Sequence, residues 1–171
     1  VDHAHHHHII HCDIQPRNVL VAPDDTIKLT GFALSAQLDE DDQTALVNFS
    51  SALYMAPEQL TKGEVTPQTD LFSLGVVIYE VLTGVHPFIS NVMPTIGHNI
   101  VAKAHKPMSQ VRPEIPSVLD RILDRALKKH PAGRYQTMMD LCGDLVLVLD
   151  EVAPEEERVP DEVRMEQLVG V

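Results

Sequence analysis

Histidines are the first residues in the chain whose types and spacing could do chemistry. They occupy positions 3, 5, 6, 7 and 8. On a helix, His3 and His7 would lie on one face, and this four-residue spacing can bind a divalent metal ion. The alternative is an exposed helix end that carries ordinary surface histidines, and we favour it.

The two cysteines carry the other reactive side chains. Cys12 and Cys142 lie far apart and have no CxxC spacing, so the sequence predicts neither a zinc site nor a disulfide framework. A reducing, cytoplasmic compartment fits this usage best. Cys12 is either a redox-sensitive thiol or an inert loop cysteine, and we favour the inert one.

Five short segments follow one another in a recognisable order. They are His11-Cys12-Asp13-Ile14-Gln15-Pro16-Arg17-Asn18-Val19-Leu20, Lys28-Leu29-Thr30-Gly31-Phe32-Ala33, Tyr54-Met55-Ala56-Pro57-Glu58, Asp70-Leu71-Phe72-Ser73-Leu74-Gly75 and Pro131-Ala132-Gly133-Arg134. Together they resemble the signature set of protein kinases, in particular the Hanks-type Ser/Thr kinases of bacteria. Any one string arises by chance, but this order and spacing over about 125 residues does not.

The resemblance implies a set of roles in phosphoryl transfer. Asp13 stands where the family's catalytic aspartate accepts the proton of the substrate hydroxyl, and Asn18 stands where a second magnesium ligand lies. Asn18 and Leu20 are the implied cofactor-binding positions. The implied cofactors are ATP and Mg²⁺.

Three positions depart from the family's pattern. Gly31 replaces the aspartate that holds magnesium, Gln15 replaces the catalytic-loop lysine, and Cys12 replaces the arginine that clamps a phosphorylated loop. Loss of one stabilising donor costs roughly 100- to 1,000-fold in rate, whereas a retained general base contributes at most about 10⁴-fold. We therefore expect impaired catalysis, with Asp13 and Asn18 bracing the loop.

The resemblance gives the remaining site residues structural roles. His11 and Phe32 match an internal stack, where they pack instead of reacting. Asp70 matches the buried helix residue that holds the catalytic-loop backbone. We expect Glu58 and Arg134 to form a partly buried ion pair that is costly to break from one side.

The expected fold is mainly α-helical, the C-terminal lobe of a kinase whose parent fold is α+β, with a small β-hairpin beside the catalytic-loop remnant. Two short strands at 19–21 and 27–30 flank a Pro23-Asp24-Asp25 turn. The clearest helix has Thr66 as its N-cap, Pro67 as its first residue and Gly84 just past its end. It is apolar on most sides, which predicts a central position.

Further helices are expected at residues 1–10 (the end of one), 94–106, 117–129 and 137–152, the last opened by a capping-box pattern at Thr137 and Asp140. Residues 31–55 lose periodicity and carry the acidic cluster 39–42, which predicts a surface loop. Its hydroxyls at Thr44, Ser50 and Ser51 are ordinary, although another kinase could phosphorylate them.

Composition limits the architecture and the partners. The 171 residues are 44% apolar, enough to bury one core, and we expect a kinase-like domain at 1–153 and an acidic tail or linker at 154–171. A net charge of -12 argues against nucleic acid or an anionic membrane as partner. No apolar run approaches the roughly 20 residues of a membrane span, so no membrane association is expected within this chain.

The leading hypothesis is a noncatalytic kinase-like module that binds a protein partner. No glycine-rich loop precedes His3, so we expect the ATP-covering N-terminal lobe to be absent and apolar surface to be exposed near the N-terminus. A homo-oligomer or the missing lobe could cover that surface. The alternatives are an active ATP-dependent Ser/Thr kinase whose N-terminal lobe lies elsewhere, and a decayed fragment.

Overall fold

A long central helix, α4 (Pro67–Thr83), organises the molecule. The computed structural model describes residues 1–32, 49–89 and 94–152. Leu71, Phe72, Val76 and Tyr79 of α4 are almost completely buried in the core. The central position predicted for this helix is therefore confirmed.

The two ends of α4 follow from its sequence. Thr66 is extended and precedes Pro67, whose fixed φ suits the first helical position. The Thr66 amide donates a hydrogen bond to the Thr69 hydroxyl at 3.0 Å. Gly84 ends the helix in the left-handed conformation, with φ of 76°, and its amide bonds the Glu80 carbonyl.

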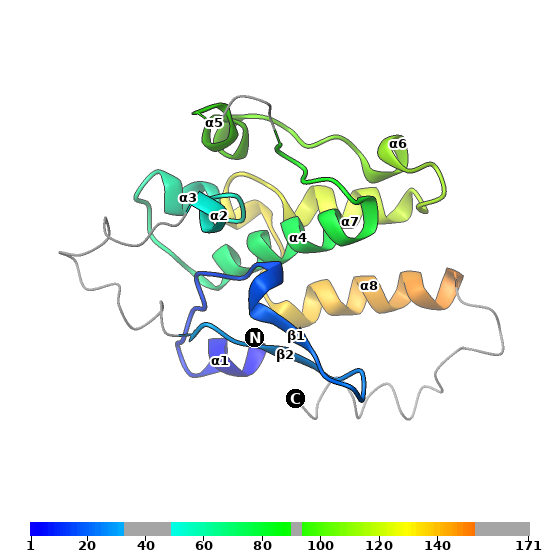
Figure 1. Cartoon of the computed structure of the whole chain (residues 1–171), viewed down its shortest axis with the longest axis horizontal. Coiled ribbons are helices and arrows are strands. Elements are labelled where there is room, and N and C mark those ends of the chain that lie inside the picture. Colours follow the sequence, from blue (N-terminus) through cyan, green and yellow to red (C-terminus); the bar gives the residue numbers. More distant parts are fainter. Residues whose placement is uncertain (33–48, 90–93, 153–171) are drawn as a thin grey trace.

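Shorter helices surround α4 (Figure 1). In that view, α4 and α7 cross the middle of the molecule, with α5 and α6 on one side and α8, α1 and the two strands on the other. Their bounds are α1 Asp2–His6, α2 Phe49–Ala52, α3 Pro57–Leu60, α5 Pro94–Ala102, α6 Met108–Val111, α7 Val118–Ala126 and α8 Met138–Val152, with 3₁₀ turns η1 Pro16–Asn18 and η3 Pro131–Gly133. The expectation of a mainly helical fold is confirmed.

The strands β1 (Val19–Val21) and β2 (Ile27–Leu29) pair antiparallel, with Val19 opposite Leu29 and Val21 opposite Ile27. In the turn between them, Asp25 has a positive φ of 61°. Aspartate tolerates this left-handed conformation better than most residues. The predicted hairpin is thus confirmed.

Several predicted boundaries were wrong. α1 ends at His6, and α5 ends at Ala102, where the Ile100 carbonyl of its last turn accepts a hydrogen bond from Lys129 Nζ at 2.6 Å. α7 ends at Ala126, beyond which the carbonyls of Lys128 and Lys129 accept hydrogen bonds from Arg134. α8 begins as predicted, with reciprocal bonds between Thr137 and Asp140.

The predicted loop at 31–55 contains the short helix α2 at its end. Its acidic cluster 39–42 and Thr44 lie outside the described residues, as does the expected tail 154–171. Within the described part of the chain, no helix is long and apolar enough to cross a membrane.

The conformation of Gly84 leads to a testable prediction. Gly84→Ala should lower the free energy of unfolding by about 1 kcal/mol, because a Cβ disfavours the left-handed conformation. Gly97→Ala is the control, since Gly97 lies in α5, where an added Cβ would meet nothing within 4 Å, and it should stabilise by about 0.5–1 kcal/mol. Urea unfolding of both variants measures the difference. A Gly84→Ala protein as stable as the native chain would contradict the assigned cap.

Candidate active site

The loop between α1 and η1 is held by one buried carboxylate, that of Asp70 on α4. Its Oδ2 accepts from the His11 amide at 2.8 Å, and its Oδ1 accepts from the Cys12 amide at 2.9 Å. Cys12 adopts a positive φ of 64° there. The two bonds fix the backbone immediately before Asp13.

His5 adds a contact to Asp70 that sequence reasoning missed. Its Nε2 lies 2.7 Å from Asp70 Oδ2, and its side chain is 8% exposed. The neighbouring histidines at positions 3, 6, 7 and 8 are exposed, and the rings of His3 and His7 contact each other at 4.5 Å. Among the described residues, no group of three or more His, Cys, Asp or Glu side chains is placed to hold a metal ion.

His11 packs and hydrogen-bonds within the core. Its Nε2 donates to the Thr30 carbonyl at 2.9 Å, and its Nδ1 accepts from the Asp13 amide at 3.2 Å. Its ring meets that of Phe32 edge to face, with centroids 4.4 Å apart. The arrangement uses both ring nitrogens and joins the loop to the end of β2.

The Asp13 carboxylate is 8% exposed and faces three donors. Asn18 Nδ2 donates to Oδ2 at 2.9 Å, and Gln15 Nε2 donates to Oδ1. Arg17 Nη2 lies 3.5 Å from Oδ2. The structure thus brings the two predicted residues Asn18 and Gln15 onto Asp13, together with Arg17, which had no predicted role.

Ser51 on α2 is the second site residue that sequence reasoning missed. Its hydroxyl is buried and accepts from Arg17 Nη2 at 2.8 Å and from Gln15 Nε2 at 3.2 Å. A serine in an aperiodic stretch gives no signal of this kind, because its partners lie 34 and 36 residues away. The side chain of Gln59 on α3 also reaches the loop, donating to the Cys12 carbonyl at 2.9 Å.

Gly31 leaves no carboxylate, and little room for one, beside Asn18. Its φ is 92°, and a Cβ built there would meet Asn18 Nδ2 at 2.8 Å and Cγ at 3.0 Å. A side chain at position 31 would therefore require the Asn18 amide to shift.

Leu20, the other predicted cofactor-binding residue, lies on β1 and is 51% exposed. Three more apolar side chains near it in sequence are also exposed, namely Ile9, Val21 and Ile27. These four side chains are exposed, and a continuous apolar surface near the N-terminus stays a prediction.

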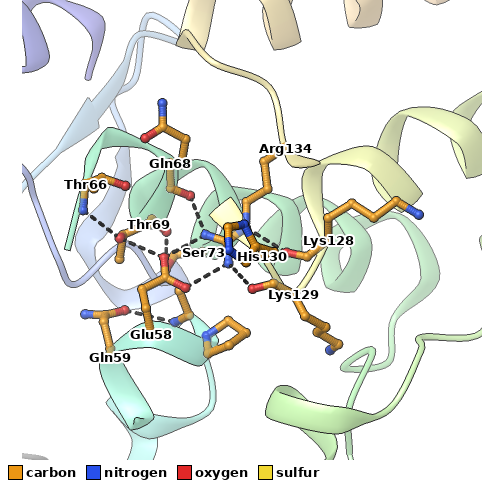
Figure 2. Close-up of polar contacts among 12 residues, drawn as sticks. Glu58, Gln59, Thr66, Gln68, Thr69, Ser73, Lys128, Lys129, His130 and Arg134 are labelled. Carbon is orange, nitrogen blue, oxygen red and sulfur yellow. Dashed lines mark hydrogen bonds and ion pairs between the residues drawn. The ribbon is translucent and has the colours of Figure 1, made fainter. Parts of the chain in front are cut away.

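A buried ion pair joins the segments that follow the loop (Figure 2). Arg134 Nη1 and Nη2 donate to Glu58 Oε1 and Oε2 at 2.7 and 2.8 Å, and Arg134 is 1% exposed. Arg134 also donates to the carbonyls of Gln68, Lys128 and Lys129, while the Thr69 hydroxyl donates to Glu58. Burial, the largest single cause, raises the pKa of Glu58, but the hydrogen bonds from Arg134, a backbone amide and Thr69, together with the charge of Arg134, outweigh it and the pKa is lowered. The pair links α3, α4 and η3.

A comparison with models of known protein families identifies the family of this chain. The protein kinase domain model matches residues 1–145. The chain belongs to the protein kinase family. Its relatives include the serine/threonine-protein kinase PknB of Mycolicibacterium smegmatis, 33% identical over 91% of this chain and 25% of that protein. A probable serine/threonine-protein kinase of Clostridium perfringens is 37% identical over 83% of this chain and 21% of that protein.

This chain spans about a quarter of the length of the curated kinases it matches. The resemblance to bacterial Ser/Thr kinases drawn from the motifs is confirmed. The functional roles of Asp13, Gln15, Asn18, Leu20 and Gly31 stay predictions.

The Glu58 and Arg134 pair gives a stability prediction. Arg134→Met should lower the free energy of unfolding by about 3–5 kcal/mol, because it leaves the Glu58 carboxylate buried without its cation. The control is Asp124→Asn, which breaks an exposed pair with Lys128 of the same 2.7 Å length and should cost less than about 0.5 kcal/mol. Chemical denaturation measures both. If both variants lowered the free energy of unfolding by the same amount, the buried pair would contribute no more to stability than the exposed one.

Cys12 gives a reactivity prediction. Burial, followed by the nearby charges of Asp70 and Asp13, raises the pKa of the Cys12 thiol to about 12. Because the thiolate is the reactive form, iodoacetamide at pH 8 should leave Cys12 unmodified in the folded chain and alkylate it in urea. Peptide mass spectrometry reads out the modification. Rapid labelling of folded Cys12 would restore the redox-sensitive alternative.

Proposed function

We propose that this chain is a kinase-like C-terminal lobe, residues 1–153 with an acidic tail at 154–171, that is impaired in phosphoryl transfer and acts by binding a protein partner. The observation that carries the proposal is the glycine at position 31, which offers no side-chain oxygen. Phosphoryl transfer depends on charges held around the γ-phosphate and its magnesium ions. At position 31 the carboxylate is absent, and a Cβ there would lie 2.8 Å from Asn18 Nδ2.

The side chains present do not fit a bound Mg²⁺. Magnesium in such sites is held by carboxylates together with substrate phosphates. Asn18 offers one amide oxygen, its Nδ2 is bonded to Asp13, and Gly31 offers no side-chain oxygen. ATP and Mg²⁺ therefore enter by family resemblance, and no step is assigned to them.

Two features support a protein partner. Leu20, Val21 and Ile27 of the hairpin are each more than half exposed, and exposed apolar surface favours association. The net charge of -12 favours a neutral or basic partner over an acidic one. The N-terminal lobe of a longer protein, or a second copy of this chain, could cover the same surface.

The retained Asp13 and Asn18 pair favours one alternative, an active Ser/Thr kinase whose N-terminal lobe lies outside this chain. Asn18 Nδ2 bonds both the backbone oxygen and the carboxylate of Asp13, at 2.8 and 2.9 Å, so the proton acceptor is held in place. The missing carboxylate at position 31 weighs against this alternative.

Phosphoryl transfer decides between the two functions. Incubated with radiolabelled ATP, Mg²⁺ and a general protein substrate, the native chain should transfer no more phosphate than Asp13→Ala does, because the magnesium ligand is missing. Transfer that disappears in Asp13→Ala would establish the active kinase. The full-length M. smegmatis relative is the positive control.

Thermal unfolding with and without the metal gives an independent check. ATP with Mg²⁺ should raise the unfolding midpoint no more than ATP with EDTA, since a ligand stabilises only in proportion to its binding. A midpoint that rises only when Mg²⁺ is present would contradict the lost metal site.

A further inference from the structure

The helices α7 and α8 enclose a groove on the side of the lobe away from α5 and α6. They pack against each other (Figure 1), and the groove between them has a volume of about 390 Å³. Ile122 of α7 and Val148 of α8 line it and are buried, whereas Leu147, which also lines it, is 61% exposed. The α7–α8 groove therefore combines a buried apolar floor with an exposed leucine that a bound segment would cover.

Two arginines give the α7–α8 groove a positive charge. Arg121 and Arg125 lie one turn apart on α7, line the groove and are exposed. Arg125 lies over the Tyr135 ring at 4.1 Å, and the Tyr135 hydroxyl donates to Asp144 Oδ2 at 2.6 Å. Among the described residues, no carboxylate forms an ion pair with either arginine. The groove thus presents two cations to a ligand, in a chain whose net charge is -12.

The sequence that follows α8 has the complementary chemistry. α8 ends at Val152, and the chain continues with three consecutive glutamates at 155–157. Apolar side chains come next, at Val159, Val163, Met165 and Leu168. Carboxylates followed by apolar side chains match a groove that has two arginines and an apolar floor.

The glutamates are also within reach of the groove. Along α8, Val148 lies about 6 Å and Asp144 about 12 Å before Val152, at about 1.5 Å per residue. The residues 153–157 span at most about 16 Å when extended, at about 3.3 Å per residue. Pro154 disfavours a continued helix, so a chain that reverses there brings the glutamates alongside the groove.

We propose that the acidic segment 155–168 docks in the α7–α8 groove of the same chain, with its glutamates on Arg121 and Arg125 and its apolar side chains against Ile122 and Leu147. Covalent attachment favours this occupant over a separate partner, because a short connection gives an effective concentration of millimolar order. The inference goes beyond the proposed function and uses no residue of the catalytic loop. It therefore holds or fails independently of phosphoryl transfer.

A single tryptophan in the full chain tests the docking, since the native sequence has none. Val159→Trp places the reporter in the acidic segment, and docking should shift its emission to shorter wavelength and protect it from acrylamide quenching. Adding Arg121→Glu should lower the ratio of docked to free segment by about tenfold, because like charges then face each other. Replacing Glu155, Glu156 and Glu157 by lysine in that variant should restore docking.

Lys128→Glu is the matched control. Lys128 is 50% exposed and follows α7 directly, but it does not line the groove, so the same charge reversal is made just outside the site. The ratio of docked to free segment should stay within about twofold of that of the reporter chain, because exposed charges away from the contact are screened.

Four results would overturn the proposal. The reporter could emit as a fully hydrated indole, or Arg121→Glu could release the segment no more than Lys128→Glu does. The folded chain with both charge reversals could fail to recover docking. A blue shift that grows with protein concentration would assign the groove to the segment of a second copy. If Arg121→Glu does not fold, the three lysine substitutions alone decide, since they should release the segment from the native arginines.

Discussion

The buried carboxylate of Asp70 is the constraint on which the site depends. A charge taken out of water is costly unless hydrogen bonds replace its hydration, and Asp70 obtains them from the His11 amide, the Cys12 amide and His5. All three donors belong to the segment that leads into Asp13. Since Asp70 sits in the first turn of α4, the catalytic loop is fixed to the most buried helix of the fold. After burial, the same negative charge also helps to raise the pKa of the Cys12 thiol.

Sequence patterns predicted the parts of the structure that local chemistry determines. Thr66, Pro67 and Gly84 bound α4 because capping acts within one turn of the helix end. The predicted ends of α5 and α7 were wrong where distant side chains take the carbonyls near the helix end, as Lys129 does in the last turn of α5 and Arg134 does beyond α7. Local patterns cannot register such a contact.

The contacts of Arg17 with Asp13 and Ser51 were beyond sequence reasoning for the same reason. Family motifs name Asp13 and Asn18, but they leave Arg17 as a variable residue and Ser51 as one hydroxyl among several. Only the folded chain brings α2 against the catalytic loop. The role of His5 was missed for another reason. It lies in a run of histidines whose other members face solvent, so its type and position do not distinguish it.

Substitutions at the buried ion pair and at position 15 have different consequences for the fold. Breaking the Glu58 and Arg134 pair strands a buried charge, so the fold cannot lose either partner cheaply. Replacing the loop lysine by Gln15 strands nothing, because the amide still donates to Asp13 and Ser51. The architecture of this lobe therefore does not depend on a lysine at position 15.

A substitution at position 31 would meet a different environment from one at position 15. At position 15 the side chain lies among polar partners, and Arg17 reaches the same acceptors across one 3₁₀ turn. At position 31 the backbone φ is 92°, and a Cβ would lie 2.8 Å from Asn18 Nδ2. A side chain there would require the Asn18 amide to shift, and that amide is itself bonded to Asp13. The conformation at position 31 is therefore coupled, through Asn18, to the position of the Asp13 carboxylate.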